Sequence, residues 1–142
     1  MKIERLGVII NTEKYSECVS FYLTILEAEI MFELDDEYSK LTCLQFGDCY
    51  LMVEAEGVAR RDGKRINECP TKIRINVTDV MEAQKKLLVM GTKAEVRKYP
   101  WGTVINTFDP DGNRVGIRDE AGFYRQVQEF KAQQAAGSNT TR

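Results

Sequence analysis

An internal repeat limits most strongly what this chain of 142 residues can fold into. Asn11 corresponds to Asn76, and Gly47 to Gly112, at an offset of 65 residues that is expected to hold without gaps. The order of expected elements repeats at the same offset, because each half holds a strand, an amphipathic helix and three more strands. A repeat of this length is typical of a duplicated supersecondary unit. We therefore predict an α+β fold made of two tandem βαβββ modules.

The first module is expected over residues 3–57. Its first strand, 3–11, is rich in β-branched residues, and the apolar residues that follow recur at steps of three and four, as in an amphipathic helix. That apolar stripe consists of Tyr15, Cys18, Val19, Tyr22, Ile25 and Leu26. The three later strands are expected at 28–34, 38–46 and 49–54. A polar loop, 55–70, then leads to the second module.

The second module is expected over residues 68–122. Asp79 can cap its helix, with Glu82 in the capping-box position and Gly91 at the end of the helix. The strands are expected at 72–77, 94–99, 103–108 and 114–119. One domain would thus span residues 1–122. Residues 123–142 would form a short C-terminal helix, at 123–132, and a disordered tail.

A tight turn is predicted at Asp109-Pro110-Asp111-Gly112-Asn113. Proline fixes φ, glycine accepts positive φ, and Asp and Asn side chains bond their own backbone. This turn would join the last two strands in a hairpin.

Together with Pro100-Trp101-Gly102 upstream and the doubled βαβββ order, this turn resembles the vicinal oxygen chelate superfamily. That superfamily includes glyoxalase I, extradiol dioxygenases, fosfomycin-resistance enzymes and bleomycin-resistance proteins. Phe21-Tyr22 with Leu26 is also similar to a helix motif of the family, although Glu27 stands where a glycine is usual. The resemblance implies an open cup-shaped mixed sheet, the glyoxalase/bleomycin resistance fold, and a homodimer.

The resemblance also indicates where a metal would bind. In metalloenzymes of this superfamily, the first and fourth strands of each half supply His, Gln or Glu ligands. The matching positions here are Gly7, Leu51, Lys72 and Gly116, and the chain contains no histidine. None of these side chains is a suitable donor. We therefore expect neither a metal nor another cofactor, and we assign no catalytic residue.

Strand alternation predicts which side chains line the cup. The first half would contribute Gly7, Ile9, Asn11, Cys49, Leu51 and Val53. The second half would contribute Lys72, Arg74, Asn76, Arg114, Gly116 and Arg118. One wall is therefore apolar and the other basic. Arg74 and Arg118 would bind an anionic group with their guanidinium forks, and Trp101 would offer a stacking surface.

Each of these residues has a structural alternative. Charged residues are commonly solvated or paired, Trp101 can be a plug above the turn, and Asn11 and Asn76 can bond strand-end backbone groups. The predicted ligand-binding set is Ile9, Asn11, Leu51, Val53, Arg74, Asn76, Trp101 and Arg118.

The function favoured is metal-free binding of a small planar or anionic organic molecule, in the manner of the bleomycin-resistance branch. Three alternatives stay open. The first is a metal-independent lyase, isomerase or hydrolase using Glu54, Tyr50 or Cys49. The second is a metalloenzyme with unusual ligands, and the third is an interaction module without a small ligand.

The formal net charge of −2 gives no reason to expect nucleic acid or a membrane as partner. The lack of an apolar signal region indicates a cytoplasmic protein. The four cysteines show no C-x-x-C spacing and are expected to remain thiols.

Overall fold

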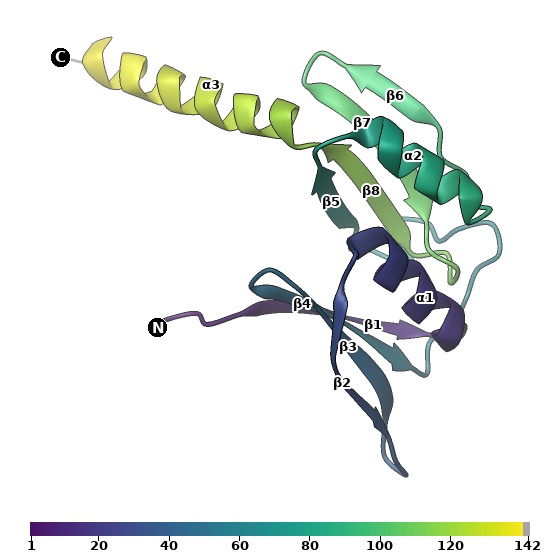
Figure 1. Cartoon of the computed structure of the whole chain (residues 1–142). Coiled ribbons are helices and arrows are strands. Elements are labelled where there is room, and N and C mark those ends of the chain that lie inside the picture. The colour runs from purple at the N-terminus through teal and green to yellow at the C-terminus, as the bar shows by residue number, and fades with distance from the viewer. Residues whose placement is uncertain (141–142) are drawn as a thin grey trace. The chain divides into compact units, whose positions relative to one another are not determined.

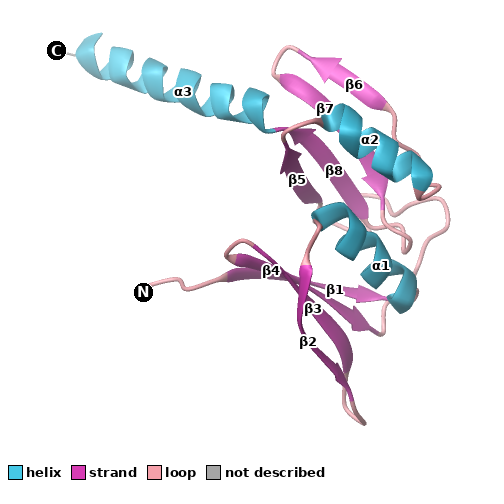
Figure 2. Ribbon diagram, in the orientation of Figure 1, coloured by secondary structure: helices cyan, strands magenta, loops and turns pink. Residues whose placement is uncertain are grey.

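The computed structural model describes residues 1–140, which form two four-stranded sheets and three helices (Figures 1 and 2). The elements of the first half are β1 (Leu6–Thr12), α1 (Tyr15–Leu26), β2 (Glu29–Asp35), β3 (Lys40–Phe46) and β4 (Cys49–Ala55). Those of the second half are β5 (Ile73–Val77), α2 (Val80–Val89), β6 (Val96–Tyr99), β7 (Gly102–Phe108), β8 (Arg114–Asp119) and α3 (Glu120–Thr140). The α+β fold class with a doubled βαβββ order is thus confirmed. Within residues 1–140, none of the helices combines the length and the hydropathy that a membrane span needs.

The chain forms two compact units whose boundary cuts through the last hairpin. The first unit consists of residues 1–72 and 108–114, and the second takes the rest of the described chain. The 109–113 turn is therefore part of the first unit, although β7 and β8, which it joins, lie mainly in the second. This division differs from the modules expected from the sequence at that turn.

In the first unit the strand order is β1-β4-β3-β2, with β1 parallel to β4 and the other neighbours antiparallel. α1 packs on β3 and β4. The hydroxyl group of Tyr15 in α1 forms a hydrogen bond with that of Thr42 in β3, which identifies the helix-covered face of the sheet. Buried side chains fill the space between helix and sheet: Cys18, Phe21, Tyr22, Leu44, Leu51 and Val53.

The 109–113 turn is fastened to α1 by two buried carboxylates. Asp111 accepts hydrogen bonds from the backbone N–H groups of Glu13 (2.9 Å) and Lys14 (2.7 Å), and Lys14 gives the helix no side-chain cap of its own. Asp109 accepts a hydrogen bond of 2.7 Å from the hydroxyl of Tyr22. Burial, reinforced by the charge of Asp109, raises the pKa of Tyr22 well above its ordinary value. The turn thus caps the N-terminus of a helix that lies far away in the sequence.

In the second unit the strand order is β5-β8-β7-β6, with β5 parallel to β8 and β6 antiparallel to β7. The side chain of Asp79 accepts hydrogen bonds from the backbone of Met81 (3.0 Å) and Glu82 (3.2 Å), which confirms the predicted cap of α2. Gly91 follows the helix with a φ of 75°. The core of this unit is made of Val80, Leu87, Ala94, Val104, Ile105, Val115 and Ile117.

The C-terminal helix is longer than expected. α3 covers Glu120–Thr140, whereas the sequence predicted a helix over 123–132 and disorder after it. The prediction gave too much weight to the Gly-Ser-Asn-Thr composition, because alanine and glutamine between 132 and 136 are good helix formers. Residues 141–142 of the expected tail lie outside the described residues.

The repeat is confirmed in its order, but its offset is not constant. Val8 pairs with Leu51 in the first sheet, and Ile73 pairs with Val115 in the second. The first members of these pairs are 65 residues apart, and the second members are 64 apart. The gap-free offset was therefore wrong by one residue at the fourth strand. Because successive side chains of a strand face opposite sides, a shift of one residue reverses the face.

Candidate functional site

Arg118, on β8, is the buried charged residue around which the candidate site is built. It is only 4% exposed. Its Nη1 donates a hydrogen bond to Oε1 of Gln126 (2.8 Å), and its Nη2 donates one to the carbonyl oxygen of Trp101 (3.0 Å). Its Nε is buried and has no hydrogen-bond partner, and no ion pair forms with Arg118 in the described part of the chain. The charge of the neighbouring Asp119 interacts with this guanidinium, but its buried Nε has no acceptor. A buried donor left unpaired is costly, and an anion placed beside Nε would relieve this cost.

Two aromatic rings cover this guanidinium. The Cζ atom of Arg118 lies 4.8 Å from the ring centroid of Trp101 and 5.3 Å from that of Phe123 in α3. Trp101 also stacks on Tyr99, with 5.0 Å between the ring centroids and 5° between the ring planes. Such cation–π contacts stabilise the charge. The stacked pair thus places a second ring, that of the 40% exposed Tyr99, next to the ring that contacts the cation.

Asp119 ties the start of β7 to the start of α3 next to Arg118. Its carboxylate accepts hydrogen bonds from the backbone N–H groups of Thr103 and Gly122, both at 2.8 Å. Desolvation raises the pKa of Asp119, but the backbone bonds and the positive charge of Arg118 lower it, so the pKa lies below the ordinary aspartate value. A Cβ atom at Gly102 would lie 2.8 Å from Nη2 of Arg118. Glycine at this position therefore lets the guanidinium approach the backbone.

The predicted residues on β5 share the sheet face of Arg118. Asn76 is paired with Arg118, and Arg74 with Gly116, across the parallel strands β5 and β8. Arg74 and Asn76 are exposed. The face assignment made for these two strands from the sequence is confirmed, and it brings two arginines and one asparagine to the same side of the sheet.

Two residues of the predicted ligand-binding set, Leu51 and Val53, do not reach the open face of the first sheet, the face opposite α1. Leu51 is 1% exposed and Val53 is fully buried. Val53 pairs with Thr42, whose hydroxyl group bonds Tyr15 of α1, so this side of β4 lies under the helix. The prediction was wrong because it carried the repeat offset onto β4, whereas the pairing with β1 sets the face of that strand.

Tyr50, Met52 and Glu54 take the places on the open face that the sequence had assigned to their neighbours. One row across the four strands consists of Ile9, Met52, Cys43 and Phe32. A second row consists of Asn11, Glu54, Leu41 and Leu34, and a third of Gly7, Tyr50, Gln45 and Glu29. The central row is apolar, as the expected wall was. The sequence could have indicated this face of β4, because polar side chains at 50 and 54 alternate with aliphatic ones at 51 and 53.

Ile9 and Asn11 lie on this open face, as the sequence predicted. Ile9 is about half exposed. The side-chain amide of Asn11 donates to the carbonyl oxygen of Ala55 (3.1 Å) and to a carboxylate oxygen of Glu54 (3.4 Å). The structural alternative, a bond to strand-end backbone, is therefore the one realised for Asn11. Tyr50 and Glu54 are four residues apart on one strand, about 13 Å at the usual rise, so they do not form an acid–base pair.

A metal centre of the kind found in the superfamily's metalloenzymes does not fit these residues. With the corrected register Tyr50 replaces Leu51 beside Gly7, and a Cβ atom at residue 7 would collide with the Tyr50 ring. In the second half the same register sets Lys72 beside Arg114, because the residues that follow them, Ile73 and Val115, are paired; neither side chain is a suitable donor. Among residues 1–140, no three His, Cys, Asp or Glu side chains are grouped closely enough to hold an ion. Phenol and ammonium groups are poor replacements for imidazole or carboxylate donors.

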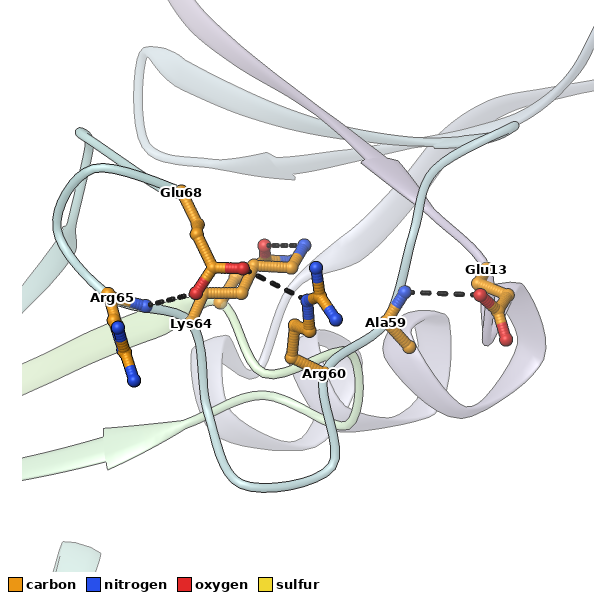
Figure 3. A network of polar contacts seen from close by, with 7 residues as sticks. Glu13, Ala59, Arg60, Lys64, Arg65 and Glu68 are labelled. Atoms are coloured by element: carbon orange, nitrogen blue, oxygen red, sulfur yellow. Dashed lines mark hydrogen bonds and ion pairs between the residues drawn. The ribbon is translucent and has the colours of Figure 1, made fainter.

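The basic loop before β5 is fastened within the first unit by its own charges (Figure 3). Nε of Arg60 lies 2.9 Å from one carboxylate oxygen of Glu68, and the other oxygen accepts the backbone N–H of Arg65 at 3.2 Å. Nζ of Lys64 donates to the side-chain oxygen of Asn113 (2.6 Å), which joins the loop to the 109–113 turn. These contacts give the loop a structural role in the unit.

The cysteines are expected to differ sharply in reactivity. Brief treatment of the native protein with iodoacetamide should modify Cys49 first and leave Cys18 and Cys43 unmodified, because Cys49 is exposed and the other two are buried. Burial, with the nearby charges of Asp109 and Asp111, raises the pKa of Cys18 far above its ordinary value and suppresses its thiolate. Peptide mass spectrometry measures the result, with the protein in urea as the control in which all cysteines react. Equal labelling of Cys18 and Cys49 in the native protein would contradict this packing.

No family model matches the sequence, and no curated protein matches it. Solved structures do match. A glyoxalase family protein from Enterococcus faecalis is 20% identical with a TM-score of 0.65, over 83% of this chain and 97% of that chain. A glyoxylase/bleomycin resistance protein/dioxygenase domain from Frankia is 10% identical with a TM-score of 0.66, over 84% and 97%. A fosfomycin resistance protein from Listeria monocytogenes, complexed with Mn(II) and sulfate, is 16% identical with a TM-score of 0.61, over 80% and 88%.

These matches extend over most of each chain at low sequence identity, so they bear on the fold. They agree with the resemblance carried by the 109–113 turn, by Pro100-Trp101-Gly102 and by the doubled element order. The chain therefore has the glyoxalase/bleomycin resistance fold.

Proposed function

We propose that this protein binds a small aromatic oxyanion without a resident metal, at a site made by Arg118, Trp101, Arg74 and Asn76. The observation that carries the proposal is the state of Arg118. Its guanidinium is buried, lies against two aromatic rings, forms no ion pair in the described chain and has a buried Nε without a partner. A ligand carboxylate or phosphonate would supply the missing acceptor, in the charged form that binds a guanidinium most strongly.

The neighbouring residues suit the rest of such a ligand. Tyr99, which is 40% exposed and stacked on Trp101, would offer its ring to an aromatic group of the ligand. Arg74, exposed on the adjacent strand of the same sheet face, adds a second positive charge, and Asn76 adds a neutral donor and acceptor. A few polar anchors beside aromatic surface are typical of small-molecule sites.

One of the similar structures supports an oxyanion as the ligand class. A mutant of the fosfomycin resistance protein from Listeria monocytogenes was solved with Mn(II) and 1S,2S-dihydroxypropylphosphonic acid, at 13% identity and a TM-score of 0.64. The donors of the present chain do not fit a metal at the matching positions. Guanidinium groups would therefore meet the ligand charge here.

Benzoate is expected to raise the melting temperature and to change the fluorescence of Trp101, the only tryptophan of the chain. Benzamide has the same ring without the charge and should bind at least tenfold more weakly. Arg118→Gln should weaken benzoate binding at least tenfold, because a hydrogen bond to a charged group contributes about 1.5–3 kcal/mol. Fluorescence titration and thermal denaturation measure both effects.

Arg125→Gln is the matched control, because Arg125 is an exposed arginine on α3 that pairs only loosely with Glu129, at 4.0 Å. It should bind benzoate as the unmodified protein does. Equal affinity for benzoate and benzamide, or binding that survives Arg118→Gln, would show that Arg118 does not hold an anion.

A further inference from the structure

We infer that α3 covers the anion site and that Gln126 occupies the place of a ligand oxygen on Arg118, so that the helix competes with the ligand and selects for anions. This inference rests on the function proposed above. It assigns to the C-terminal helix a role in ligand choice.

The contact between Gln126 and Arg118 has the form of a ligand contact. Oε1 of Gln126 accepts the Nη1 hydrogen at 2.8 Å, a bond that a carboxylate oxygen of a ligand would also make. Gln126 itself is exposed, while Arg118 beneath it is buried. Phe123, one turn earlier, places its ring over the same guanidinium. The first turns of α3 therefore form part of the cover of the cation, and a ligand that reaches Nε must displace this cover.

α3 buries little surface, its first turns included. Over residues 120–137 only Gly122 is buried, and the helix exposes large aromatic side chains, with Tyr124 61% and Phe130 60% exposed. A helix with so little buried surface belongs to the least stable part of a structure. Displacing its first turns is therefore easier than displacing a strand or α2.

This arrangement discriminates between anions and neutral molecules. A neutral ligand that displaces Gln126 exchanges one neutral acceptor for another and gains little. An oxyanion replaces the amide oxygen with a charged acceptor, which forms the stronger bond to a guanidinium. The site therefore discriminates against neutral ligands, because the Gln126 amide that they must displace binds Arg118 as well as they do. Gln126 is thus a specificity-determining residue. A ligand binds at Arg118 only if its bond to the guanidinium is stronger than the bond of the Gln126 amide.

Two substitutions of Gln126 are expected to act in opposite directions on benzoate binding. Gln126→Ala removes the competitor and should tighten binding about tenfold, the lower end of the factor that one hydrogen bond to a charged group is worth. It should also raise the affinity for benzamide and so reduce the preference for the anion. Gln126→Glu places a tethered carboxylate on Arg118 and should weaken benzoate binding at least tenfold. Trp101 fluorescence reports on all titrations, and circular dichroism checks that both variants are folded.

Gln133→Ala, two turns further along α3, is the control and should bind benzoate unchanged. The inference is overturned if Gln126→Ala weakens binding, which would make Gln126 a ligand contact, or if both Gln126 variants bind as the unmodified protein does. In either case, binding that still depends on Arg118 leaves the proposed function standing. If neither benzoate nor phenylphosphonate binds to the unmodified protein or to Gln126→Ala, the proposed function itself falls, and this inference falls with it.

Discussion

Replacing Asp111 with alanine is expected to lower the free energy of unfolding by about 3 kcal/mol, since a hydrogen bond to a charged group contributes about 1.5–3 kcal/mol and two such bonds are lost. The Asp111 carboxylate is fully buried and accepts the backbone N–H groups of Glu13 and Lys14 at the start of α1. Lys14, at the N-cap of α1, forms no side-chain cap of its own. Urea unfolding followed by far-ultraviolet circular dichroism measures the loss.

Asp62→Ala is the control for this change, because Asp62 is exposed in the loop before β5. It should change the free energy of unfolding by less than about 0.5 kcal/mol. Asp111→Asn keeps one acceptor oxygen and should fall between the two. A loss for Asp111→Ala as small as that of the control would mean that solvent, and not Asp111, satisfies the start of α1.

Leu51→Ala is expected to cost about 3 kcal/mol, within the usual range for removing a buried leucine side chain. Leu51 is 1% exposed, on the face of β4 that α1 covers. Met52→Ala, on the opposite face of the same strand, should cost less than about 1.5 kcal/mol, because Met52 is only partly buried. Urea midpoints of the two variants, with their slopes compared, give the difference.

This pair of substitutions tests the register of β4 directly. The gap-free repeat would place residue 51 on the open face and residue 52 in the core, and it therefore predicts the reverse order of costs. A larger loss for Met52→Ala than for Leu51→Ala would restore that register. It would also return Leu51 and Val53 to the candidate ligand surface.

The two halves of the repeat present different side chains on their sheets. In the second half, the β5–β8 face carries the guanidinium groups of Arg74 and Arg118. In the first half, the open face is apolar along its central row and carries Tyr50 over Gly7. Duplication thus supplies the scaffold twice, while the side chains on it differ. The homodimer implied by the resemblance stays a prediction, which size-exclusion chromatography with light scattering would test.

The lengths of the hairpin turns explain why the fourth strand was misplaced. Gly47 and Gly112 are both turn glycines and fixed the offset at 65. Between Phe46 and Cys49, however, the first turn has only Gly47 and Asp48, whereas the second turn has five residues, 109–113. Equivalent glycines in turns of different length do not mark equivalent strand positions. The register after a turn follows from the turn geometry and from the partner strand.

The sequence alone determined the fold class, the order of the elements, the Asp79 cap and the 109–113 turn. These depend on local chemistry: the period of apolar residues, the side-chain bonds of aspartate and the φ values open to glycine and proline. The same alternation placed Arg74 and Arg118 on one face, since β5 and β8 happen to keep the expected register.

Only the tertiary structure decided the rest. The offset of the repeat between β1 and β4 and the capping of α1 by Asp111 both join residues far apart in the chain. None of these contacts has a local signal, because each depends on pairing register and packing and not on neighbours in sequence. The repeat therefore determined that there would be two similar sheets, and long-range pairing decided which side chains each of them presents.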